Sequence, residues 1–153
     1  MLNIELNKQY LHDNFLKLDI SLKSFQHSLQ KCREIGIKES YTFEETEALD
    51  SLTSKFARIS DIFTQKVLRS IFLLLHEGTS NLIDLANRAE KLNVINNADA
   101  LLLVRDIRNQ ISHEYEDDNL NTIYSKIFIL ADSLRSDIEK SKQFAIKYEW
   151  LDN

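Results

Sequence analysis

The side chains best suited to chemistry concentrate in one short segment of the sequence. Arg108, Asn109, Ser112, His113 and Tyr115 lie within a stretch of eight residues. An imidazole exchanges protons near neutral pH, so His113 can act as a general base or a general acid. The guanidinium of Arg108 is permanently charged and forked, which suits a phosphate that gains negative charge in a transition state. The segment therefore predicts acid–base chemistry at a phosphate group.

The other histidines and the cysteine do not form a metal or nucleophile motif. No two of the four histidines are four residues apart, and Cys32 is the only cysteine. A zinc site needs such residues at close spacing. The Gly-x-Ser-x-Gly motif of a serine nucleophile is absent from the sequence. We therefore expect no metal and no cofactor, and we interpret His12, His27 and His76 as residues of helix surfaces or helix ends.

A helix over residues 98–115, drawn as a wheel with 100° per residue, separates the segment into three rows. The row predicted to face the core is apolar and consists of Ala100, Leu103, Val104, Ile107 and Ile111. The row on roughly the opposite side consists of Arg105, Asn109 and His113. The row on the flank between them consists of Arg108, Ser112 and Tyr115. Arg108 and His113 diverge by about 140° on this wheel, so one ideal helix is not expected to bring both to one atom.

Two further apolar residues of this helix, Leu101 and Leu102, also fall away from the predicted core side. Large apolar side chains on a polar face indicate that another surface covers them. We therefore predict a homodimer whose interface includes Leu101 and Leu102. Two facing copies of the segment would supply two arginines and two histidines to one cleft.

The stretch from Arg108 to Tyr115 matches the pattern R-N-x3-H-x-Y. It resembles the signature of the HEPN superfamily, especially of the HepT-like proteins that pair with a minimal nucleotidyltransferase. It is also similar to the relatives described as nucleotidyltransferase substrate-binding proteins. The motif covers eight residues, whereas the expected helical architecture, the late position of the motif and the chain length agree over the whole chain.

The resemblance implies a metal-independent endoribonuclease that acts as a toxin and is restrained by a cognate nucleotidyltransferase, its antitoxin. Arg108 and His113 would be catalytic in a composite site of a dimer, and RNA would supply its own 2′-OH as the nucleophile. Arg105, Asn109 and Ser112 would bind phosphate or support the catalytic side chains. Tyr115 would accept AMP from the partner enzyme.

Two other hypotheses stay open. The chain can be a non-catalytic subunit that presents substrate or nucleotide to a nucleotidyltransferase, with the motif holding phosphate but not cleaving RNA. It can also be a structural helical dimer with a degenerate motif. A neighbouring gene for a small nucleotidyltransferase would separate the first two hypotheses from the third, and growth arrest that His113→Ala abolishes would separate the toxin from the binding subunit.

The pattern of apolar residues predicts an all-α fold in one domain, residues 1–153. The sequence has no proline and two glycines, which favours long helices. Apolar residues recur at steps of three and four over 4–35, and Gly36 follows as an expected helix end. Thr42 and Glu45 have capping-box spacing before a helix that ends near His76. A short helix near 82–92, the helix over 98–115 and a last helix that continues towards Tyr148 complete an antiparallel bundle of four main helices plus one short helix.

Composition and charge limit the class of protein. Of the 153 residues, 43% are hydrophobic and 28% are charged, which is enough apolar material for one core. The formal net charge of −5 excludes a broadly basic nucleic-acid coat but not a local RNA site. We find no signal-peptide pattern and no apolar run of membrane-spanning length, and a single cysteine favours a reducing compartment. We therefore expect a cytoplasmic protein without a membrane partner.

Overall fold

The computed structural model describes residues 3–78, 81–113 and 120–152, and within these ranges every regular element is helical. The elements are α1 (Ile4–Ile35), α2 (Phe43–Asp61), the π-helical segment η1 (Ile62–Val67), α3 (Leu68–Leu74), α4 (Leu82–Lys91), α5 (Ala98–Ser112) and α6 (Leu120–Lys147). The predicted all-α fold class is confirmed. In the described part of the chain, no helix is both long and apolar enough to cross a membrane.

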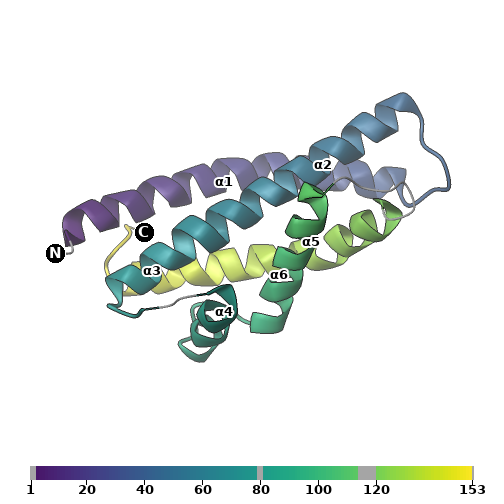
Figure 1. Ribbon diagram of the computed structural model, residues 1–153. Coiled ribbons are helices and arrows are strands. Elements are labelled where there is room, and N and C mark those ends of the chain that lie inside the picture. Colours follow the sequence, from purple (N-terminus) through teal and green to yellow (C-terminus); the bar gives the residue numbers. More distant parts are fainter. Residues whose placement is uncertain (1–2, 79–80, 114–119, 153) are drawn as a thin grey trace.

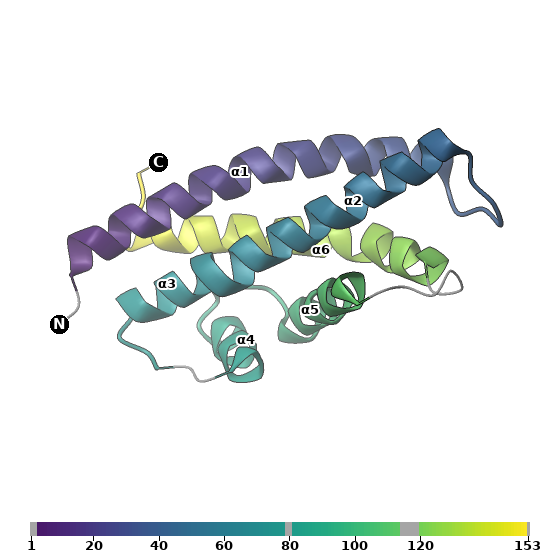
Figure 2. The same cartoon turned by 45° about the horizontal axis from the view of Figure 1, so that its top comes forward.

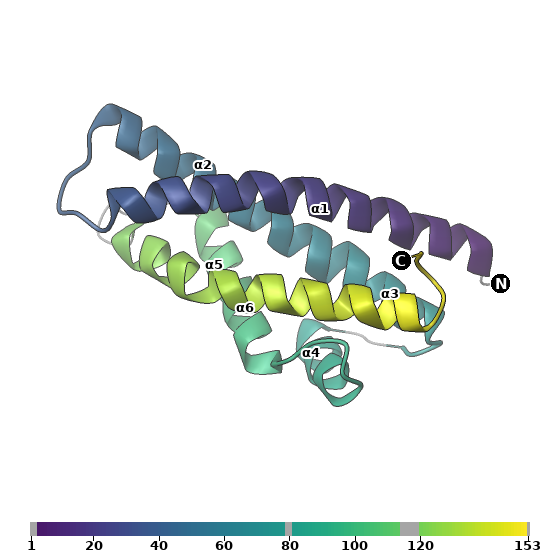
Figure 3. The same cartoon turned by 180° about the vertical axis from the view of Figure 1, so that it is seen from behind.

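Three long helical rods lie side by side, with the shorter α4 and α5 on one side of them (Figures 1 and 2). The helices α2 and α3, joined by η1, form one continuous rod that runs antiparallel to α1. The third rod, α6, also runs opposite to α1 and lies beside it in the view from behind (Figure 3). In Figure 1, α5 runs steeply across the rods. The α2–α3 rod and α6 are therefore each antiparallel to α1 but parallel to one another, and α5 lies across them, so the arrangement differs from the predicted antiparallel bundle of four main helices.

Local sequence signals set several helix ends. The expected capping box is present, because Thr42 Oγ1 accepts a hydrogen bond from the Glu45 N–H and Glu45 Oε1 accepts one from the Thr42 N–H. Gly36 ends α1 with a φ of 74°, in the left-handed region that favours glycine, and its N–H donates to the Cys32 carbonyl. Three other helices begin at asparagines whose side chains accept backbone N–H groups: Asn3, Asn81 and Asn97.

The rod of α2 and α3 contains a π-helical turn that we did not predict from the sequence. The apolar face continues through this turn, and Ile59, Phe63 and Val67 are all fully buried. Within the turn, the buried hydroxyl of Thr64 donates to the Ser60 carbonyl at 2.8 Å. A π-turn widens the helix locally and is frequent at functional sites.

The core joins residues from all of the helices and holds the single cysteine. The rings of Phe25 and Phe56 connect α1 to α2, with 6.1 Å between their centroids. Cys32 of α1 is also buried, and its thiol donates to the Ala48 carbonyl of α2 at 3.3 Å. Burial raises the pKa of the Cys32 thiol, despite the opposing charges of two lysines. A buried thiol with a raised pKa acts as a small apolar residue and not as a nucleophile.

The buried face of α5 differs from the predicted face. Leu101 is 0% exposed and Leu102 is half-buried against the core, whereas Leu103 is 52% exposed. The prediction that Leu101 and Leu102 point away from the core is therefore wrong, and a buried Leu101 has no surface to offer to a dimer. The physical reason is that α5 packs against α2, α4 and α6, so its buried arc is wider than one apolar row of a helical wheel.

Substitutions of Leu101 and Leu103 test which side of α5 is buried. Leu101→Ala should lower the free energy of unfolding by about 2–5 kcal/mol, because it deletes buried methyl groups and leaves a cavity. Leu103→Ala should change it by about 0.5 kcal/mol or less, because the side chain is largely in solvent. Urea denaturation of the two variants measures both values. Equal destabilisation by the two substitutions would contradict the orientation of α5.

Candidate functional site

An ion-pair network joins the arginines of the motif to α2. Arg108 binds Asp61 with two donors, Nε to Oδ1 at 2.6 Å and Nη2 to Oδ2 at 2.8 Å. Arg105 Nη1 donates to the same Oδ1 atom at 3.0 Å. The side chains of Arg108, Arg105 and Asp61 are 23%, 27% and 38% exposed. The network is therefore partly shielded but open to solvent on one side.

The charges of this network stabilise one another. Burial raises the pKa of Asp61, but hydrogen bonds and charge from Arg108 and Arg105 outweigh this effect and leave the pKa below its ordinary value. The hydrogen bond from Asp61 raises the pKa of Arg108, and burial opposes that shift. Asp61 is thus a carboxylate and Arg108 a cation across the physiological pH range. The bidentate contact fixes the plane of the guanidinium.

Ser112 completes the environment of Arg108. Arg108 Nη1 donates to Ser112 Oγ, and this hydroxyl donates in turn to the Arg108 carbonyl at 3.3 Å. The expected alignment of Arg108 with Ser112 is therefore confirmed, whereas the third residue of that row, Tyr115, is not among the described residues. A guanidinium has five N–H donors, and the bonds to Asp61 and Ser112 use three of them. Two donors of Arg108 have no partner among the described residues and can bind a phosphate.

The helix ends earlier than expected, before the histidine. The last residue of α5 is Ser112, and His113 follows as the C-cap with an extended backbone, φ −83° and ψ 148°. Its side chain is exposed. The predicted helix over 98–115 is therefore too long, and the separation of about 140° does not apply, because His113 is not on the helix. Tyr115 lies outside the described residues.

Arg105 and Asn109 differ in their surroundings, although the predicted row places both on the side away from the core. Asn109 is exposed, as expected for the side away from the core. Arg105 was expected there too, but it contacts Asp61 and is largely covered. The reason is again the packing of α5, because α2 crosses the side of α5 that the sequence pattern leaves polar.

The structure places an open groove next to this network. It has a volume of about 730 Å³ and lies over α1, α2, η1 and the end of α5. The residues that line it, named here the basic groove, are Lys17, Ser54, Ala57, Arg58, Asp61, Ile62, Lys66 and Ile111. Sequence reasoning did not find Asp61 or these cations, because they come from segments that are distant in sequence and separately resemble ordinary charged positions of helix surfaces.

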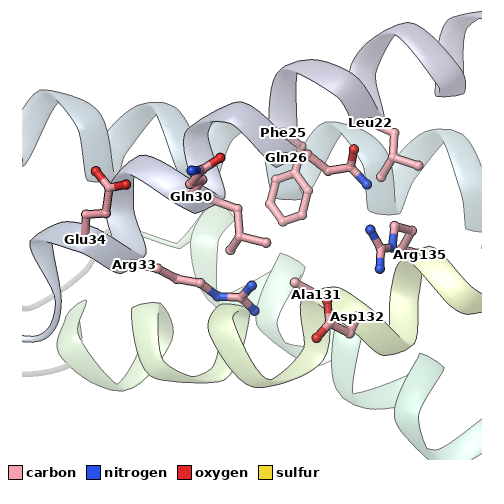
Figure 4. A pocket seen from close by; sticks show the side chains of 10 residues that line it. Leu22, Phe25, Gln26, Gln30, Arg33, Glu34, Ala131, Asp132 and Arg135 are labelled. Atoms are coloured by element: carbon pink, nitrogen blue, oxygen red, sulfur yellow. The ribbon is translucent and has the colours of Figure 1, made fainter.

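A second concavity lies between α1 and α6, at residues that are not part of the motif (Figure 4). Its volume is about 520 Å³, and its floor is apolar at Phe25. Two arginines line it, but so do two acids: Arg33, Arg135, Glu34 and Asp132. The guanidinium of Arg33 already donates to the Phe128 carbonyl at 2.8 Å. The formal charges in this concavity cancel, so it lacks the positive character of the basic groove.

Among the described residues, no group of three or more His, Cys, Asp or Glu side chains is arranged to hold a metal ion. Comparison with known protein families, with characterised proteins and with solved structures finds no match to this chain.

Removing the charge of Asp61 tests the network. Asp61→Asn should lower the free energy of unfolding at pH 7 by about 1 kcal/mol, a value that allows for the solvent screening of a partly exposed carboxylate. The pKa of Asp61 is lower in the folded state than in the unfolded state. The ion pair therefore contributes its full free energy above the unfolded-state pKa of about 3.9, and this contribution is lost as the pH falls through the folded-state pKa. The difference between the wild type and the variant should therefore shrink below about pH 4.

Urea denaturation at several pH values measures this difference. Asp50→Asn is a matched control, since Asp50 is exposed on the same helix. A difference for Asp61→Asn that stays constant down to pH 2 would contradict the ion pairing.

Proposed function

We propose that this protein is a metal-independent endoribonuclease of the HEPN type and acts as the toxin of a pair with a nucleotidyltransferase. The observation that carries the proposal is the position of Arg108. It belongs to the R-N-x3-H-x-Y motif, keeps two N–H donors without a partner among the described residues, and is held by Asp61 at the edge of the basic groove.

The residues support transesterification of RNA. His113 would remove the proton of a ribose 2′-OH, whose oxygen then forms a bond to the neighbouring phosphorus as the bond from phosphorus to the 5′-oxygen breaks. Arg108 would stabilise the negative charge that develops on the phosphate oxygens. A proton from a general acid would neutralise the leaving 5′-oxygen. The products would be a 2′,3′-cyclic phosphate and a free 5′-hydroxyl.

The need for both an acid and a base supports a homodimer, because the motif contains a single histidine per chain. With Leu101 in the core, another part of α5 must supply the contact. Leu103 and Ile129 are exposed at the junction of α5 and α6, where they line a small hollow of about 170 Å³. This junction is the apolar surface near the motif that a second copy would cover.

Purified protein should cleave RNA in the presence of EDTA, because no step uses a metal ion. His113→Ala and Arg108→Ala should each reduce the rate by about 10²–10⁴-fold, the usual contribution of a general base or of a charge stabiliser. His27→Ala, a substitution at an exposed histidine of α1, should leave the rate unchanged. Light scattering on the same sample should give twice the chain mass of 17.9 kDa. Cleavage that requires a divalent metal, or that persists in His113→Ala, would exclude the mechanism.

The proposed partner is a nucleotidyltransferase that transfers AMP to Tyr115. The adenylate would add bulk and a negative phosphate near the motif and so oppose the binding of RNA. Mass spectrometry after co-expression with a cognate enzyme should find AMP on Tyr115, and Tyr115→Phe should abolish the modification and leave the toxin active. Modification at another residue alone would contradict this part of the proposal.

The Asp61 contact favours one alternative, a non-catalytic subunit that holds a substrate or nucleotide for a nucleotidyltransferase. Asp61 already neutralises Arg108 and reduces the charge available to a transition state. Such a subunit would bind RNA or nucleotide phosphate through Arg108 and would not cleave it. The cleavage assay with EDTA therefore separates the two functions.

A further inference from the structure

The basic groove is positively charged although the chain as a whole has a negative net charge. Three exposed cations line it, one each from α1, α2 and η1: Lys17, Arg58 and Lys66. Within the described part of the chain, none of these three side chains makes a hydrogen bond or an ion pair. Some basic side chains elsewhere are paired with acids, as Lys38 is with Glu45 and Lys142 with Asp19.

The single acid in the groove does not cancel this charge. Asp61 is the only acidic residue among those that line it. Its carboxylate already accepts three hydrogen bonds from Arg105 and Arg108, and these two cations more than balance it. The groove and its α5 edge therefore have a clear excess of positive charge in a chain whose formal net charge is −5. A localised excess of this kind attracts a polyanion.

The shape of the groove favours a chain over a compact ligand. Its volume of about 730 Å³ is open to solvent, and small side chains, Ser54 and Ala57, line the part contributed by α2. Ile62 and Ile111 supply apolar contact, but no aromatic residue lines the groove. Without aromatic stacking platforms, a nucleic acid would be held by its phosphates and not by its bases.

We propose that the basic groove binds the phosphodiester backbone of single-stranded RNA and leads it to Arg108. This inference rests on the proposed function, because it takes RNA as the substrate. Lys17, Arg58 and Lys66 contact successive phosphates, and Arg108 binds the next phosphate along the strand with its two remaining donors. Binding through phosphates alone is weakly dependent on sequence and strongly dependent on salt.

The test measures binding of a fluorescently labelled, single-stranded RNA oligonucleotide by anisotropy, in the full chain with His113→Ala so that the RNA stays intact. Lys17→Ala and Lys66→Ala together should weaken binding by about tenfold or more at low salt. They should also reduce the slope of log Kd against log salt by about 1.4, at about 0.7 per phosphate contact. Lys23→Ala with Lys91→Ala is the matched control, since both lysines are exposed, lie outside the groove and remove the same charge.

An unchanged affinity and slope in the Lys17/Lys66 variant would overturn the inference, as would an equal loss in the control variant or the absence of RNA binding. Circular dichroism verifies that both variants are folded. The cleavage assay is read separately. RNA that binds through the groove but is not cleaved by the wild type refutes the proposed nuclease and leaves the groove supported. Cleavage through Arg108 and His113 with no contribution from Lys17 and Lys66 refutes the groove alone.

Discussion

The bidentate contact between Asp61 and Arg108 fixes how the motif is presented on the protein. Apolar burial supplies the larger free energy for docking α5, since Leu101, Val104 and Ile107 are all buried and each contributes about 1.5–3 kcal/mol. Partly exposed ion pairs contribute less, about 0–1 kcal/mol. The apolar contacts therefore hold α5 in place, and the ion pairs determine the direction of the guanidinium. A phosphate bound in the proposed way would meet an arginine that is already oriented, which would reduce the conformational entropy lost on binding.

The π-turn explains how one rod serves both the core and the groove. In a regular α-helix, a row with steps of four residues drifts by about 40° per step. Ile59, Phe63, Val67 and Ile71 form such a row and are all fully buried. The wider turn of η1 offsets the drift and keeps the row against the core. The side of the rod that faces away from the core then also keeps its direction. Lys66 of η1 therefore lines the same groove as Asp61, which lies one turn earlier.

Features that depend on neighbouring residues could be predicted from the sequence, whereas features that depend on packing could not. The capping box of Thr42 and Glu45, the end of α1 at Gly36 and the row of Arg108 and Ser112 are all local, and all are present. The buried face of α5 could not be predicted because α5 packs against three other helices. A helical wheel describes a single helix and carries no information about its neighbours. The basic groove was missed because its cations come from three elements. The π-turn did leave a signal, since the apolar row takes three successive steps of four from Ile59 to Ile71, where an α-helix alternates threes and fours.

The net charge of the chain is negative, whereas the charge of the basic groove is positive. This difference determines where an anionic strand would be attracted to the protein. At physiological ionic strength the Debye length is about 8 Å, so the net charge of the chain is largely screened at longer distances. An RNA strand bound as proposed would therefore gain little from long-range steering, and the local field of Lys17, Arg58 and Lys66 would act only once the strand is close. The contacts of such a strand would therefore be made within the groove, whose lining includes Asp61, the residue that orients Arg108.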